Sequence, residues 1–334
     1  MTRKQADEDD TRALFASGLT KVFKQRDGSG HVHALRGVDL EVAAGATVGL
    51  VGESGSGKTT FGRIAAGLTH PTGGRIELPG DPGGRGRWGR RRPSDVQMIF
   101  QDPRSSLDPR LPVAESIAEP LLARGLSAAR NDVMSLIERV GLPGAIADQR
   151  PHELSGGQCQ RVAIARAVAV RPKLIIADEP VSALDLSIQA QVLNLLKDLQ
   201  EEFGTAVLLI SHDLGVVRFF CADLYVLYLG QVVERGATEA VLRDPRHPYT
   251  EALASAAPSF SFGQETKRIV LAGDPPRPEN PPTGCAFHTR CHRRIGQVCD
   301  DQAPLEWPTQ TGSSRCHLLA DSPAPQLESR LRLP

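Results

Sequence analysis

The chain has 334 residues, and its 39 lysines and arginines balance 39 acidic residues, so the formal net charge is zero. This balance argues against electrostatically driven nucleic-acid binding, which needs a basic excess, and 40% hydrophobic with 23% charged residues excludes a wholly disordered chain. No uncharged apolar run reaches the roughly 18 residues of a membrane span, the start has no apolar segment typical of a signal peptide, and six cysteines are too few for a secreted disulfide scaffold.

The first part of the chain is predicted to form strands around a glycine-rich turn. Residues 1–10 are highly charged and are expected to be frayed, and residues 19–50 favour short strands and turns. The stretch ATVGLVGESGSGKTTFGRIAAGL then predicts an apolar strand, a turn and a helix. Residues 79–94 are rich in Gly, Pro and Arg, which is typical of a loop.

The middle of the chain alternates predicted helices and buried strands. Residues 112–141 are helical in pattern, whereas PKLIIADEP and TAVLLISHD are typical of buried parallel strands. An amphipathic helix between those strands is expected to end at Gly204, with the apolar positions Ile188, Val192, Leu195, Leu199 and Phe203. After residue 258 the composition shifts to Pro and Cys, which predicts two units, residues 11–258 and 259–334.

The glycine-rich turn matches the phosphate-loop pattern G-x-x-x-x-G-K-[ST] between a strand and a helix. Glycines let backbone N–H groups turn toward phosphates, Lys58 supplies a positive charge, and the Thr59 hydroxyl can bind Mg²⁺. The alternative is a chance glycine-rich turn. The nucleotide-binding set comprises Gly52, Glu53, Ser54, Gly55, Ser56, Gly57, Lys58, Thr59 and Thr60.

Two adjacent acids follow the buried strand LIIADEP. Asp178 is expected to hold Mg²⁺ as a Walker B acid does, and Glu179 is expected to polarise the attacking water. The alternative is an ordinary strand-end turn with solvated acids. The phosphate loop upstream favours the catalytic interpretation, because a nucleotide triphosphatase needs such an acid.

The segment LSGGQ predicts a second helix start that could accept an anion. Ser155 is a good N-cap, followed by two glycines and the helix QCQRVAIARAVAV. One nucleotide needs only one phosphate loop, so the residues alone do not explain a second one. The alternative is a well-capped helix with no further role.

These motifs, in this order, resemble those of ATP-binding cassette (ABC) ATPases: the phosphate loop, MIFQDP, LSGGQ, LIIADEP with SALD, and ISHD. The resemblance implies an α/β fold with a RecA-like core, an antiparallel β-subdomain and a helical subdomain, here followed by a small Cys-containing C-terminal extension. It also implies that two cassettes pair head to tail, with each ATP between the phosphate loop of one and LSGGQ of the other.

The resemblance also implies roles for individual residues. Phe23 would stack on adenine, although a core position is an equal alternative, and Asp185 would cross the dimer interface. Gln101 would bind Mg²⁺ with Thr59 and Asp178, and His212 would brace the γ-phosphate, which makes Glu179, His212 and Lys58 the expected catalytic set. The residues expected to contact the partner's nucleotide are Ser155, Gly156, Gly157 and Gln158.

Further stretches, among them FQDPRSSLDPR, YLGQVVERG and HPYTEAL, resemble the ATPase subunits of bacterial oligopeptide and dipeptide importers, and the second ATPase type in particular. The resemblance implies a second ATPase subunit, two membrane permeases and an extracytoplasmic solute-binding protein as partners, and a place on the cytoplasmic face of the plasma membrane. Nickel or another small solute remains an alternative cargo, and a soluble, non-transport ABC ATPase is a rival interpretation.

Four of the six cysteines lie near the end of the chain: Cys285, Cys291, Cys299 and Cys316. Their spacing is not that of C-x₂-C zinc sites, but clustered thiols in a cytosolic chain favour metal ligands over disulfides. Some members of the importer family hold a [4Fe–4S] cluster in such a segment. Zinc with His288, His292 or His317, and reduced thiols with no metal, are the alternatives. Cys159 and Cys221 are expected to be packing residues.

Overall fold

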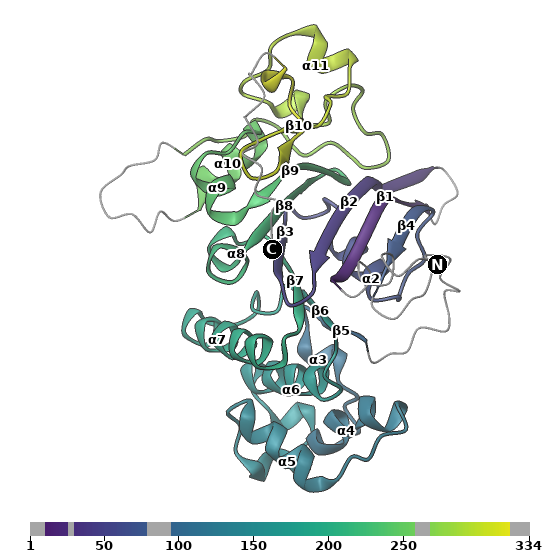
Figure 1. Ribbon diagram of the computed structural model, residues 1–334, viewed down its shortest axis with the longest axis vertical. Coiled ribbons are helices and arrows are strands. Elements are labelled where there is room, and N and C mark those ends of the chain that lie inside the picture. Colours follow the sequence, from purple (N-terminus) through teal and green to yellow (C-terminus); the bar gives the residue numbers. More distant parts are fainter. Residues whose placement is uncertain (1–10, 26–29, 79–94, 258–267, 321–334) are drawn as a thin grey trace, which may run out of the picture.

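The computed structural model describes residues 11–25, 30–78, 95–257 and 268–320 (Figure 1). The expected frayed start and the loop predicted at 79–94 lie outside these ranges. The strands are β1 (Arg12–Lys24), β2 (His31–Ala43), β3 (Thr47–Val51), β4 (Gly73–Glu77), β5 (Val96–Ile99), β6 (Leu174–Asp178), β7 (Ala206–Ser211), β8 (Asp223–Tyr228), β9 (Gln231–Ala237), β10 (Trp307–Pro308) and β11 (Ser313–Ser314). The helices are α2 (Lys58–Ala65), α3 (Pro103–Ser106), α4 (Val113–Ala123), α5 (Arg130–Arg139), α6 (Gly156–Val168), α7 (Leu186–Phe203), α8 (Leu214–Phe220), α9 (Thr238–Arg243), α10 (Pro248–Ala256) and α11 (Gln297–Asp301), with the 3₁₀ turns η1 (Gly144–Asp148), η2 (Pro151–Glu153), η3 (His288–Arg290) and η4 (His317–Leu319).

The main sheet has the strand order β10-β11-β9-β8-β3-β7-β6-β5. Its middle, β8-β3-β7-β6-β5, is parallel. Along β7 the alternate residues Val207 and Leu209 pack into one core cluster and Leu208 and Ile210 into the other. A strand buried on both faces reads as a continuous apolar run, which is why the strands over PKLIIADEP and TAVLLISHD could be predicted and are confirmed.

A second, antiparallel sheet with the order β2-β1-β4 lies beside the main sheet (Figure 1). The sequence predicted short strands here, but β1 and β2 have 13 residues each. The difference arises because β1 pairs with β2 along nearly its whole length, and register shifts within it re-aim the strand without ending it. Gly and polar residues that favour turns therefore lie inside continuous strands.

The helical subdomain forms the end of the molecule opposite the C-terminal segment (Figure 1). Helices α4 and α5 confirm the helical pattern predicted over 112–141, and both pack with α6. Helix α7 is the predicted amphipathic helix, and it ends at Gly204, whose φ of 61° is the left-handed conformation that favours glycine. No helix in the described ranges is both long and apolar enough to cross a membrane.

Residues 268–320 form short helices, turns and two short strands, and they join the main sheet. Strand β11 pairs antiparallel with β9 and β10 pairs with β11, so the segment adds two strands at the sheet edge. This pairing is a tertiary feature, because two-residue strands carry no periodic signal in the sequence.

A buried histidine makes the stability of the fold depend on pH. His247 Nδ1 accepts the N–H of Tyr249 at 3.1 Å at the start of α10, and burial lowers the pKa of His247 from 6.5 to about 3. The unfolded chain therefore takes up this proton first as pH falls. We expect the contribution of His247 to stability to be complete above about pH 6.5 and to be lost progressively as the pH falls toward 3.

Urea unfolding between about pH 7.5 and 5.5 measures this effect, which approaches ~1.4 kcal/mol per pH unit for one proton. His247→Asn keeps a side-chain acceptor at the N-cap but does not titrate, so its unfolding free energy should vary less with pH than that of the wild type. His31→Asn, at an exposed position of β2, is the matched control. An unchanged pH slope in His247→Asn would contradict the interpretation.

Candidate functional site

The predicted phosphate loop lies between β3 and α2, as the sequence indicated. Gly57 caps α2 with φ 108°, a left-handed value that side chains rarely adopt, and a Cβ there would lie 2.4 Å from the Ala34 carbonyl oxygen. The glycine is therefore required by both conformation and space. Because α2 begins at Lys58, the turn places the Lys58 side chain within the loop.

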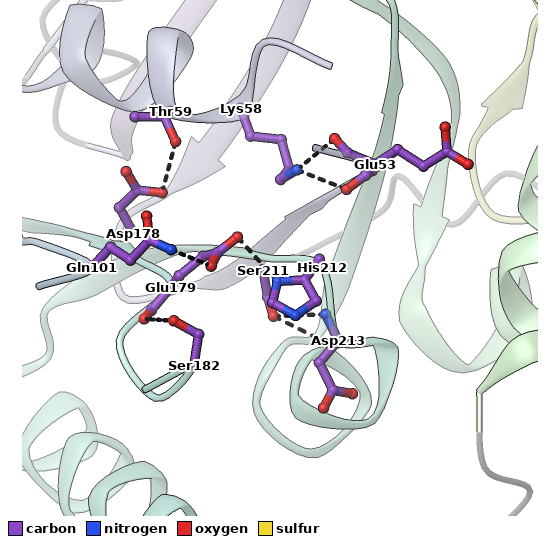
Figure 2. Close-up of polar contacts among 11 residues, drawn as sticks. Glu53, Lys58, Thr59, Gln101, Asp178, Glu179, Ser182, Ser211, His212 and Asp213 are labelled. Carbon is purple, nitrogen blue, oxygen red and sulfur yellow. Dashed lines mark hydrogen bonds and ion pairs between the residues drawn. The ribbon is translucent and has the colours of Figure 1, made fainter. Parts of the chain in front are cut away.

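The Lys58 ammonium is held inside the loop. Its Nζ donates to the carbonyl oxygens of Gly52 at 2.7 Å and Glu53 at 2.9 Å (Figure 2). Burial lowers the pKa of Lys58, and the nearby carboxylates of Glu179 and Asp178 oppose that shift by favouring the charged form. A buried ammonium that faces carboxylates and loop carbonyls is suited to bind a polyphosphate as a point charge.

Thr59 and Asp178 form the next pair, from α2 and the carboxyl end of β6. The Thr59 hydroxyl donates to Asp178 Oδ1 at 3.2 Å (Figure 2). Burial raises the pKa of Asp178, and the Thr59 hydrogen bond opposes this. In the loop itself, the Ser56 hydroxyl is buried with no hydrogen-bond partner. A hydroxyl and a carboxylate side by side, with an orphaned loop hydroxyl nearby, fit a nucleotide phosphate and its Mg²⁺, since these hard oxygen ligands are the ones Mg²⁺ prefers.

Glu179 is the centre of the site, and its carboxylate has two side-chain partners. Gln101 Nε2 donates to Glu179 Oε2 at 2.8 Å, and His212 Nδ1 lies 3.0 Å from Glu179 Oε1 (Figure 2). Because a carboxylate only accepts, this contact places a proton on His212 Nδ1. Gln101 follows β5, Glu179 follows β6 and His212 follows β7, so the three meet at the carboxyl ends of neighbouring parallel strands.

The backbone of Glu179 is strained in a way that fixes this carboxylate. Its φ is 47°, a left-handed value uncommon for a residue with a side chain. The Glu179 N–H donates to the Ile210 carbonyl at 2.9 Å, and its own carbonyl accepts the Ser182 hydroxyl at 3.2 Å. Strain of this kind persists where surrounding contacts over-determine a conformation, as they do at many functional sites.

The structure does not bring every predicted residue to this point. Ser155 caps α6 and forms a reciprocal capping box with Gln158, as the sequence indicated. In Figure 1, α6 lies among α3, α4 and α5. It lies apart from α2, the helix that contains Thr60. Asp185 lies at the start of α7, next to the highly exposed Leu186.

Phe23 lies near the end of β1, and 40% of it is exposed. The alternative prediction that Phe23 lies in the core is therefore wrong. The Lys21 ammonium lies 4.7 Å from the centre of the Phe23 ring. The ring is thus available to solvent and to a planar ligand, and its role remains a prediction.

The C-terminal cysteines are free thiols, as are the buried Cys159 and Cys221. Burial raises the pKa of Cys285 and that of Cys316 to about 11. In the described ranges, no three His, Cys, Asp or Glu residues are arranged to hold a metal ion. Burial of Cys159 and Cys221 confirms their predicted packing role.

The histidines predicted as alternative zinc ligands have other partners. His288 contacts the Cys285 carbonyl at 2.9 Å, His292 contacts Glu251 at 3.2 Å, and His317 contacts the Gln302 carbonyl at 2.8 Å. Within the described ranges the structure therefore gives no support to the [4Fe–4S] cluster or the zinc ion predicted from the sequence. Reduced thiols with no metal, the third alternative, stay a prediction.

Sequence reasoning missed two residues that contact the phosphate loop. The Arg290 guanidinium pairs with both carboxylate oxygens of Glu53, at 2.7 and 3.2 Å, and the Tyr249 hydroxyl accepts the Glu53 N–H at 2.7 Å. Arg290 is 237 positions from Glu53. No spacing pattern connects residues so far apart, although HPYT, which contains Tyr249, resembles the importer family.

Two family models match this chain. The model described as ABC transporter matches residues 35–182, and the model described as oligopeptide/dipeptide transporter, C-terminal region, matches residues 233–299. The first contains the phosphate loop, Gln101, LSGGQ and the acids that follow β6. The second begins in β9 and contains α10, Arg290 and three of the C-terminal cysteines.

Curated relatives align over most of the chain. A putative peptide import ATP-binding protein of Brucella ovis is 46% identical over 300 residues, which cover 88% of this chain and 94% of the relative. The dipeptide transport ATP-binding protein DppF of Haemophilus influenzae is 41% identical, with 90% and 95% covered. The oligopeptide transport ATP-binding protein OppF of Salmonella typhimurium is 48% identical, with 81% and 84% covered.

Solved structures share the fold at lower coverage. A dimeric ATP-binding cassette in a post-hydrolysis state, bound to ADP and Pi, matches with a TM-score of 0.60 and 32% identity, covering 67% of this chain and 98% of that one. The cbiO1 protein of Clostridium perfringens, part of the ABC transporter complex cbiONQ, matches with a TM-score of 0.61 and 28% identity, covering 70% and 92%.

Proposed function

The chain belongs to the ABC transporter ATPases, and from this we propose that it binds and hydrolyses ATP to energise a membrane importer of peptides. The relatives named as peptide, dipeptide and oligopeptide transport proteins support this cargo. The observation that carries the proposal is the Glu179 carboxylate, held by Gln101 and His212 beside the phosphate-loop lysine.

Binding of ATP would use the loop and the pair beside it. Lys58 and the loop N–H groups would bind the phosphates, and Thr59, Asp178 and Gln101 would hold Mg²⁺. Bound Mg²⁺ supplies positive charge against the phosphate oxygens. Asp178 serves this role because burial makes its negative charge costly without a cation, as the raised pKa of Asp178 indicates.

Hydrolysis would depend on Glu179 and His212. Glu179 would orient and polarise the attacking water, since its oxygens are fixed by Gln101 and by His212 and cannot rotate away. His212, oriented through Nδ1 by that contact, would lie with its other ring nitrogen beside the γ-phosphate. Phosphoryl transfer needs positioning and charge stabilisation more than covalent chemistry, and this arrangement supplies both.

Each ATP would lie between two cassettes. Ser155, Gly156, Gly157 and Gln158 begin the 13-residue helix α6, and a helix start with free N–H groups favours an anion. Ser155 and Gly156 are exposed and separate from the chain's own phosphate loop, so a partner's nucleotide would be their ligand. Phe23 would stack on adenine, and Asp185, beside the exposed Leu186, would cross the same interface.

The partners would be a second ATPase subunit, two permeases and an extracytoplasmic solute-binding protein, with no nucleic acid. Attachment to the cytoplasmic face of the plasma membrane would come from the permeases. Residues 11–258 would form the nucleotide-binding domain and residues 259–334 a C-terminal extension.

A pull-down from solubilised membranes tests the proposal, with Glu179→Gln and ATP used to hold the closed dimer. Mass spectrometry should identify two permeases and a second, different cassette. The solute-binding protein encoded with those permeases would then be tested with dipeptides, oligopeptides and nickel, and nickel binding alone would overturn the peptide assignment. Recovery of only the chain itself, or of ribosomal or DNA-repair proteins, would contradict the transport function.

A further inference from the structure

Among the described residues, the Arg290 guanidinium and the Glu53 carboxylate form a bidentate pair that joins the C-terminal segment to the phosphate loop. The Arg290 side chain is only 8% exposed and that of Glu53 26%. Burial by itself would lower the pKa of Arg290, but its hydrogen bonds to Glu53 and the charge of Glu53 raise it instead. A buried, bidentate ion pair of this kind is stronger than an exposed ion pair.

Arg290 is rigidly placed by the aromatic cluster beneath it. Phe287, three positions earlier, packs edge-on to Tyr228 with ring centres 5.2 Å apart and against Tyr249 at 5.4 Å. Tyr228 and Tyr249 are themselves 4.6 Å apart, and all three rings are fully buried. The Arg290 N–H donates to the Phe287 carbonyl at 3.0 Å. The guanidinium therefore reaches Glu53 from a fixed base.

Glu53 is held at three of its polar groups. Its N–H donates to the Tyr249 hydroxyl, its carbonyl accepts from Lys58, and its carboxylate binds Arg290. Figure 2 shows the Glu53 side chain extending away from the Lys58 ammonium. The Glu53 carbonyl therefore faces the inside of the phosphate loop, whereas its carboxylate faces the outside.

The charge of Glu53 matters because the loop has to accept a polyanion. Glu53, Asp178 and Glu179 all act electrostatically on Lys58. Asp178 and Glu179 have their own places in the ATP site, whereas an unpaired Glu53 carboxylate would only repel phosphates. A carboxylate that loses its cationic partner in a partly buried place raises the free energy of the site.

We propose that Arg290 is a positioning residue for the ATPase site: it neutralises Glu53 and holds that carboxylate outside the phosphate-binding concavity. The C-terminal extension thereby acts on nucleotide affinity, although it supplies no group that touches the nucleotide. This inference rests on the proposed ATP-binding function of the loop and adds a determinant that lies far outside the cassette motifs.

The test is a double-mutant cycle measured by equilibrium binding of Mg–ATP to the full chain. Arg290→Met should raise Kd about tenfold, which is the effect of one uncompensated charge contact. Arg290→Met combined with Glu53→Gln removes both charges and should bind Mg–ATP more tightly than Arg290→Met alone, because the repulsion disappears. In the assembled transporter, Arg290→Met should raise KM for ATP while kcat at saturating ATP stays within about twofold.

Arg293→Met is the matched control, since Arg293 lies in the same segment but is half-exposed and pairs with Glu251 at 3.5 Å. It should leave Kd within about twofold of wild type. A wild-type Kd in Arg290→Met, or a double variant that stays as weak as the single one, would overturn the inference.

Glu53→Asp covers the case in which Arg290→Met does not fold. It leaves the extension intact but draws the carboxylate one methylene back from Arg290 toward the loop, so Kd should rise, and an unchanged Kd would count against the inference. Melting temperatures identify any unfolded variant. Failure of the wild-type chain to bind Mg–ATP would refute the proposed function itself, whereas wild-type binding with no effect of Arg290 or Glu53 refutes only this inference.

Discussion

Glu179→Gln is expected to bind Mg–ATP normally and to lose at least about 100-fold in steady-state turnover, the range found when a positioned general base is removed. The amide has nearly the shape of the carboxylate, so Gln101 Nε2 can still donate to its oxygen. It lacks the negative charge that polarises water. The variant therefore separates nucleotide binding from hydrolysis.

The substitution also changes His212. In the wild type the carboxylate accepts from His212 Nδ1 at 3.0 Å, whereas the glutamine NH₂ at that place would donate. The contact that orients the His212 ring would then require a change of tautomer. Glu179→Gln therefore removes both the general base and the acceptor that orients His212, so its loss of turnover should exceed that from His212→Gln alone.

Phosphate release by the assembled transporter and equilibrium binding of Mg–ATP are the two measurements. Glu201→Gln, on the exposed side of α7, is the matched control and should turn over at the wild-type rate. Turnover of Glu179→Gln within about tenfold of wild type would remove this residue from the catalytic assignment.

Lys58→Met is expected to weaken Mg–ATP binding by about 100-fold or more, because it deletes the buried charge while keeping most of the side-chain volume. Three carboxylates, those of Glu179, Asp178 and Glu53, act on this ammonium. Without it they would face the phosphates uncompensated. The Gly52 and Glu53 carbonyls would also lose their donor, which should loosen the loop.

Calorimetric or fluorescence titration with Mg–ATP measures this loss, and circular dichroism should show the fold retained. Lys24→Met, at the exposed end of β1, is the control and should bind as the wild type does. ATP affinity within about threefold of wild type in Lys58→Met would contradict the proposed role of the loop.

Elements whose signals are local were predicted from the sequence. The strand, turn and helix around GESGSGKT follow from an apolar run, glycines that permit left-handed backbone at Gly57, and a helix that can start at Lys58. The buried strands β6 and β7, the helix α7 with its stop at Gly204, and the Ser155 capping box depend on neighbours within a few residues. Such patterns are visible without any tertiary contact.

The lengths of β1 and β2 and the environment of Phe23 could not be predicted in the same way. Strand length there depends on pairing between β1 and β2 through several register shifts. Whether an aromatic residue is buried depends on what packs against its face, and the sequence left both outcomes open for Phe23. The structure exposes 40% of it.

The sequence by itself determined the family, the phosphate loop, and the acids and histidine that end β6 and β7, since each is encoded by a short motif. Only the tertiary structure decided how these groups meet: Gln101, Glu179 and His212 converge because parallel strands end at one edge of the sheet. It also joined Arg290 to Glu53 across 237 positions. That contact exists because β11 pairs with β9 and Phe287 packs on two tyrosines, and long-range packing of this kind leaves no spacing in the chain to read.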